Sequence, residues 1–271
     1  MLDLGILLSP EGWGGRSAVA GLLAAAREAT SRGWSLWIPE HVARSDYVGS
    51  SLVMAGVVLG AVPAVRVATA GVIAGVRDPE SVVRDADVLA EVAAAGGGQF
   101  SLGAVAGYQP SDLPAERFER RYDALDALVS LVSERRRAWP LLIGAATPVG
   151  LARAARAGGW LAGTRQPLGE LSSLIERYRE LAPCGTVVVL RRWVPAGRPD
   201  GLERHPLGDG VRTPKDALVG GGRKAVARQL RALREAGAAT VVLGPVSSPD
   251  SLALLADDLV EWERATEGRR F

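Results

Sequence analysis

Cysteine, histidine and lysine are scarce in this chain of 271 residues, which has one cysteine and two histidines. The single cysteine, Cys184, excludes an internal disulfide and agrees with a reducing cytoplasm. Two histidines and the absence of a C-x-x-C pair argue against a zinc site, so we predict no metal. These absences argue against a disulfide-stabilised protein and against a zinc-dependent one.

Charge of one sign and long apolar runs are also lacking. The net charge is +2 and the isoelectric point is about 9.0. The densest basic run, Glu134–Arg137, stands at a predicted helix end, where cations complement the helix dipole. The most apolar stretch, Leu52–Val67, is interrupted by two glycines and Pro63 and is too short to span a bilayer. We therefore expect neither a nucleic-acid partner nor a membrane segment.

What the sequence does contain is a regular alternation of short β-rich runs with longer helical runs. Helix starts carry their usual signals, as in Asp78-Pro79-Glu80, where an acid caps the helix and proline follows. A long helix is predicted over Pro114–Arg136. The predicted strands are Leu4–Leu8, Ser35–Ile38, Val65–Ile73, Phe100–Val105, Pro140–Ile143, Trp160–Ala162, Thr186–Trp193 and Thr240–Leu243.

Eight strand–helix units in this length favour a single (β/α)8 TIM barrel over residues 1–271. An open doubly wound sheet is the alternative, and it would need a G-x-G-x-x-G turn after the first strand. The chain instead reads SPEGWGG over Ser9–Gly15. In a barrel of this kind, the chemistry lies on the loops that follow the strands.

Three stretches resemble one known family. Gly33–His41 reads GWSLWIPEH, Val65–Tyr108 contains VATAGVIAGVRDP and GGGQFSLGAVAGY, and Pro140–Gly163 reads PLLIGAATPVGLARAARAGGWLAG. Together they resemble the luciferase-like flavin- and deazaflavin-dependent oxidoreductases. The helix before the fifth strand runs almost directly into it at Glu134–Trp139, so the chain looks like a compact luciferase-like variant that lacks the family's usual long insertion.

The resemblance implies a cofactor, either coenzyme F420 (a deazaflavin) or reduced FMN, and hydride transfer to, or oxygenation of, a small organic substrate. The GVRDP turn at Gly75–Pro79 favours the deazaflavin. One alternative is an FMN-dependent monooxygenase fed by a separate flavin reductase, and another is a non-catalytic flavin-binding barrel. A barrel aldolase or isomerase would usually need a lysine or paired acids at strand ends, and no lysine ends a strand here.

The predicted catalytic residues are His41, Glu40 and Tyr108. His41 follows a strand end, and imidazole titrates near neutrality, so it can move a proton to or from cofactor or substrate. Glu40 is a candidate to orient that imidazole, and a solvated carboxylate is the alternative. Tyr108 follows the fourth strand and is a candidate hydrogen-bond donor to cofactor or substrate, or a packed rim residue.

The predicted cofactor-binding residues stand after the third, fourth and fifth strands. The phosphate candidate is Gly144-Ala145-Ala146-Thr147 before Pro148, because small residues and a capped helix start expose amide groups to an anion. An ordinary capped helix start is the alternative. The resemblance adds a bulge with a cis peptide bond at Ile73–Ala74 or Ala74–Gly75. The remaining predicted cofactor-binding residues are Thr69, Ala74, Gly75 and Gly107.

Three further segments carry expectations. The apolar helix Leu52–Val62 is a candidate homodimer face, although core burial explains it as well. Arg191 and Arg192 are neighbours on one strand, so one of them should face the helices while the other could pair with an anionic tail. The long polar loop Arg198–Thr213 is a candidate mobile cover for the site.

Overall fold

The structure is a computed structural model that describes residues 2–8, 17–41, 50–107, 113, 115–134, 137–195 and 214–267. Through these residues, parallel strands alternate with helices. The strands of the barrel are β1 (Asp3–Leu8), β2 (Ser35–Ile38), β3 (Arg66–Thr69), β5 (Gln99–Val105), β6 (Leu141–Gly144), β7 (Gly159–Ala162), β8 (Thr186–Val194) and β10 (Thr240–Val246).

The sheet closes on itself because the last strand pairs with the first. β10 pairs in parallel with β1, where Leu243 lies opposite Ile6, and with β8, where Val241 lies opposite Val189. The remaining strands pair in sequence order, and the short β4 (Val72–Ile73) and β9 (Leu218–Gly220) extend β5 and β8. The predicted (β/α)8 barrel is therefore confirmed.

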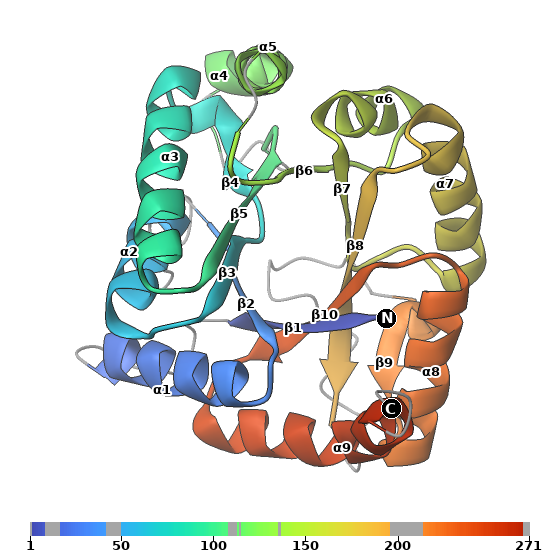
Figure 1. The fold of residues 1–271 in the computed structure, drawn as a ribbon. Coiled ribbons are helices and arrows are strands. Elements are labelled where there is room, and N and C mark those ends of the chain that lie inside the picture. The colour runs from blue at the N-terminus through green and yellow to red at the C-terminus, as the bar shows by residue number, and fades with distance from the viewer. Residues whose placement is uncertain are drawn as a thin grey trace.

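Helices surround the strands on the outside of the barrel (Figure 1). Two of them begin with the predicted caps: the side chain of Asp78 accepts from the amide of Ser81 at 2.8 Å, and Thr147 accepts from Gly150 at 3.2 Å. No described helix is both long and apolar enough to cross a membrane. The helices are α1 (Ser17–Ser31), α2 (Ser51–Ala61), α3 (Pro79–Ala95), α4 (Ala115–Glu119), α5 (Arg121–Ser133), α6 (Pro148–Ala157), α7 (Leu168–Leu181), α8 (Arg223–Glu235) and α9 (Pro249–Glu267), with the 3-10 turns η1 (Ala74–Val76) and η3 (Lys215–Ala217).

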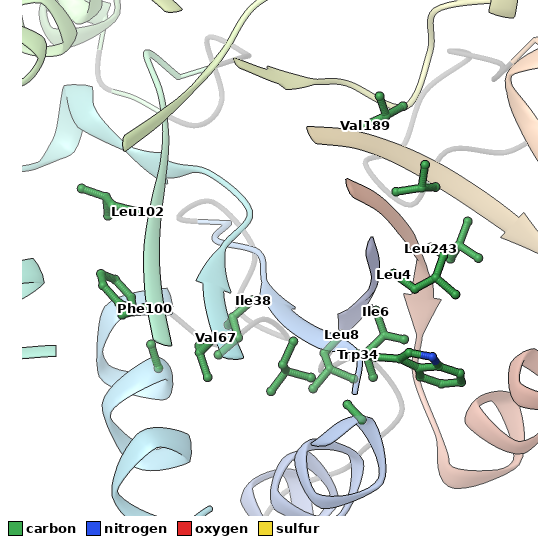
Figure 2. Packing of buried hydrophobic residues seen from close by; sticks show 14 of the residues in the cluster. Leu4, Ile6, Leu8, Trp34, Ile38, Val67, Phe100, Leu102, Val189 and Leu243 are labelled. Carbon is green, nitrogen blue, oxygen red and sulfur yellow. The ribbon is translucent and has the colours of Figure 1, made fainter. Parts of the chain in front are cut away.

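The apolar core has two layers, because side chains alternate across each strand. The larger layer packs the outer faces of the strands against the helices, and Figure 2 shows part of it. The smaller layer lies inside the barrel. It consists of Trp37, Ala68, Leu142, Leu161, Val188 and Val242, each on a barrel strand and each next to a residue of the outer layer.

Two predicted elements are interrupted. The strand predicted over Val65–Ile73 is divided into β3 and β4, because three residues at Thr69–Gly71 stand opposite two on β5 and form a bulge. The helix predicted over Pro114–Arg136 is divided into α4 and α5 at Arg120, whose φ of −95° and ψ of 10° leave the helical region. Only a short connection separates α5 from β6, as predicted for a barrel without the long insertion.

Candidate active site at the C-terminal rim

Four neighbouring strands carry the predicted site residues at one edge of the barrel. β2, β3, β5 and β6 pair in this order, and parallel strands end at the same edge. The fold therefore brings the predicted residues to one arc of the rim rather than to opposite faces. Glu40 and His41 follow β2, Thr69 ends β3, and Ala74 and Gly75 lie in η1. Gly107 follows β5, Gly144 ends β6, and Ala145–Thr147 come directly after it.

The floor under this arc is apolar. The inner layer of the core closes the middle of the barrel, and Leu7, Ala70 and Leu190 pack on it. These three residues are only partly buried. A flat apolar ring system resting on them would remove their remaining exposed surface from water, which is favourable.

Glycine at the rim serves packing more than ligand approach. A Cβ on Gly144 would lie 2.5 Å from Cγ1 of Val105, and one on Gly71 would lie 3.0 Å from the same atom. The Val105 side chain from β5 therefore fills the space that both glycines leave. The sequence predicted that the small residue Gly144 leaves space for a ligand. This prediction is wrong, because a side chain of the neighbouring strand occupies that space.

The segment after Gly144 keeps the features of an anion site. Ala146 and Thr147 are exposed, and they lead into α6, whose first amide groups have no partner within the helix. Ala145 is partly buried against the outer core, and its carbonyl accepts from the indole of Trp160 at 2.9 Å. Of the four predicted residues, Ala146 and Thr147 are thus the two that remain open to a phosphate.

The turn after β4 differs from the expected one. Ala74 and Gly75 belong to η1, and the bonds Ile73–Ala74 and Ala74–Gly75 are trans, since the cis bond among the described residues is Gly244–Pro245. Ala74 is buried in the outer core, and a Cβ on Gly75 would meet the carbonyl of Ala106 at 2.9 Å. The bulge lies earlier, at Thr69–Gly71.

Glu40 lies at the centre of a buried hydrogen-bond network. Its side chain is 0% exposed, and Oε2 accepts from the amide and hydroxyl of Ser51 at 3.1 and 3.0 Å. Oε1 accepts from the amide of Ile73 at 3.1 Å. Arg77 donates to both oxygens, at 2.7 Å from Nη2 and 3.3 Å from Nε. The solvated alternative for Glu40 is therefore wrong.

Neither Ser51 nor Arg77 is among the site residues predicted from the sequence. Arg77 stands one position before the cap of α3 and also donates to the hydroxyl of Ser50, which caps α2. The available signal was a carboxylate directly after a buried strand, because such a group needs a cation or several donors. His41 follows Glu40 and is half-buried.

Two arginines near the end of β8 face opposite sides. Arg191 shares its side with Val187 and Val189 of the outer layer, as predicted for one member of the pair. It is 2% exposed, both of its terminal nitrogens lack a hydrogen-bond partner among the described residues, and burial lowers its pKa to about 10. Arg192 is half-buried, and burial lowers its pKa as well. Tyr108 and the loop Arg198–Thr213 lie outside the described residues.

Comparisons with known proteins agree with this architecture. No protein-family model and no curated protein matches the chain. The monooxygenase RslO1 from Streptomyces bottropensis is similar in structure, with a TM-score of 0.75 and 15% identity, over 98% of this chain and 100% of that one. The coenzyme F420 dependent tetrahydromethanopterin reductase from Methanopyrus kandleri has a TM-score of 0.68 and 14% identity, over 97% and 98% of the two chains.

A third similar structure is the oxygenating constituent of 3,6-diketocamphane monooxygenase from Pseudomonas putida, in complex with FMN. It has a TM-score of 0.70 and 14% identity, over 97% of this chain and 95% of that one. At these identities the likeness concerns the fold. This chain shares one complete barrel architecture with these three proteins from end to end.

Proposed function

We propose that this protein is an oxidoreductase that binds coenzyme F420 or FMN on the C-terminal rim of its barrel, where a small organic substrate reacts. The observation that carries the proposal is the convergence of the predicted site residues on four neighbouring strand ends. Barrel enzymes hold their chemistry at this edge. The similar structures support it, because they are two monooxygenases and an F420-dependent reductase.

The residues of the rim fit such a cofactor. The partly exposed floor of Leu7, Ala70 and Leu190 suits a tricyclic ring, and the open start of α6 at Ala146–Thr147 suits its phosphate. When bound, F420 would accept a hydride from the substrate or, in its reduced form, donate one, whereas reduced FMN would supply the electrons for oxygenation.

The chain's own contribution is binding and proton transfer. His41 holds or moves the proton that accompanies the reaction, because an imidazole changes its charge near neutral pH. The amide groups at Ala146–Thr147 hold the phosphate. Ala74, Gly75, Gly107 and Gly144 shape the rim through the backbone, and Thr69 does so through the bonds of its hydroxyl to Gly103. Tyr108 is proposed as a hydrogen-bond donor to cofactor or substrate.

F420 is the favoured cofactor because of the GVRDP turn, in which Arg77 contacts Glu40. The second candidate function is an FMN-dependent monooxygenase with a separate reductase, which the FMN complex of the similar Pseudomonas protein favours.

The exposed Cys184 agrees with the reducing cytoplasm that we propose as the location. Dimerisation through α2 stays a prediction: Leu52, Met54 and Val58 face the core, whereas Val53 is 64% exposed.

Titration of the purified protein with F420, FMN and anaerobically reduced FMN, followed by fluorescence, tests the proposal. We expect saturable binding of F420 at micromolar concentrations. Tighter binding of reduced FMN, with oxygen consumption, would select the second candidate. Binding of a cofactor without turnover of any substrate would indicate the non-catalytic barrel, and binding of none of the three would reject the proposal.

A further inference from the structure

The Glu40 carboxylate joins separate segments of the rim at one point. Its donors come from the start of α2 (Ser51), from β4 (Ile73) and from the residue after η1 (Arg77). Both of its oxygens already accept hydrogen bonds from these groups. A carboxylate so fully engaged is poorly placed to exchange protons with a substrate, because every donor would first have to be released.

Two residues of the proposed site are next in the chain to members of this network. His41 is the residue after Glu40, and Ile73 is the residue before Ala74. The amide of Ile73 donates to Oε1, while Arg77 bridges both oxygens and reaches Ser50. The backbone beside His41 and the backbone beside η1 are therefore tied to the same group.

We propose that the pair Glu40–Arg77 positions His41 relative to the β4–η1 segment, and that Glu40 itself is a positioning residue. This inference rests on the proposed function, in which His41 transfers the proton and the rim beside β4 receives the cofactor. Proton transfer requires a donor and an acceptor within hydrogen-bond reach, so a small displacement of the His41 backbone reduces the rate.

The location of the pair favours positioning over a purely stabilising role. The pair lies at the C-terminal ends of the strands, the catalytic edge of such barrels, whereas stabilising residues concentrate at the opposite edge. A buried ion pair is also weak evidence for stability, because desolvation offsets the attraction between the charges. Arg77 is 25% exposed, whereas its partner is not exposed at all.

A matched pair elsewhere in the chain provides the control. Arg153 on α6 donates to both oxygens of Asp126 on α5, at 2.8 and 2.9 Å. This pair has the same two-pronged geometry, but it links two outer helices. The variants Arg153→Met and Asp126→Asn therefore measure the loss of an arginine–carboxylate pair without a displacement of His41.

The experiment compares Arg77→Met, Arg77→Lys and Glu40→Gln with these controls. The first readout is the imidazole signal of His41 in a proton–carbon NMR spectrum, assigned with His205→Gln. We expect the chemical shift of that signal to change in Arg77→Met and Glu40→Gln. It should lie closer to the wild-type value in Arg77→Lys and equal that value in the two controls. This readout needs neither cofactor nor turnover.

The second readout is turnover with the cofactor that binds. We expect kcat to fall roughly 10- to 100-fold in Arg77→Met, which is the rate loss that a misplaced catalytic group causes. The loss in Arg77→Lys should be smaller. An unchanged His41 signal in folded Arg77→Met would overturn the inference, and so would equal losses in the Arg153→Met control. Failure of the wild type to bind any cofactor would reject the proposed function instead, and the NMR comparison would still decide the positioning role.

Discussion

Thr69 and Gly103 are joined by two hydrogen bonds across the bulge between β3 and β5. The Thr69 hydroxyl donates to the carbonyl of Gly103 at 2.8 Å and accepts from its amide at 2.9 Å. The side chain thus replaces the ladder bonds that the extra residue of the bulge displaces. Thr69, a predicted cofactor ligand, is fully buried and contributes to the rim from within the barrel wall.

Replacement of Thr69 by valine keeps the shape of the side chain and removes the hydroxyl. The amide and carbonyl of Gly103 would then be buried without these partners, so we expect a loss of roughly 1–3 kcal/mol in the free energy of unfolding. Urea denaturation measures the loss, and Thr69→Ser, which retains the hydroxyl, should lose less. A Thr69→Val protein as stable as the wild type would show that the two bonds contribute nothing.

Arg191 should destabilise the protein at neutral pH. Burial lowers the pKa of its guanidinium from the ordinary range of an arginine to about 10 in the folded state, so the unfolded chain binds the proton more tightly. This shift corresponds to a penalty of ~3 kcal/mol, which is fully present below pH 10 and disappears as the pH rises toward the ordinary pKa of an arginine.

We therefore expect Arg191→Met to be more stable than the wild type at pH 7, with a difference that shrinks above pH 10. Urea denaturation at pH 7, 9 and 10.5 measures it. Arg228→Met, at an exposed position on α8, serves as the control and should change little. A destabilised Arg191→Met at pH 7 would mean that the guanidinium finds an anionic partner in solution.

Replacement of His41 by alanine should separate binding from turnover. If His41 moves the proton, His41→Ala binds the cofactor with little change, while kcat falls roughly 100- to 10,000-fold. Parallel fluorescence titration and steady-state kinetics measure the two effects, with His205→Ala as the control. Normal turnover in His41→Ala would show that His41 does not transfer the proton.

A negative charge at the start of α6 should weaken phosphate binding. Ala146→Glu places a carboxylate where the amide groups of Ala146–Thr147 are proposed to hold the cofactor phosphate, so we expect affinity to fall about tenfold or more. Fluorescence titration with the bound cofactor measures this. Ala94→Glu, at an exposed position near the C-terminal end of α3, carries the same charge and should bind normally. Equal affinity in both variants would place the phosphate elsewhere.

The sequence by itself determined the units of the barrel and their order. Local signals suffice for this, because a cap such as Asp78 or Thr147 and an apolar run such as Ser35–Ile38 act within a few residues. Since parallel strands end at one edge, the order of the units also placed Glu40, His41 and Gly144 on the same rim.

Only the tertiary structure decided what these residues contact. Glu40 meets Ser51 and Arg77 across 11 and 37 positions of sequence, and Val105 fills the space beside Gly144. The bulge at Thr69–Gly71 depends on the register of a neighbouring strand. Such contacts follow from packing between distant segments, for which periodicity and turn chemistry carry no signal.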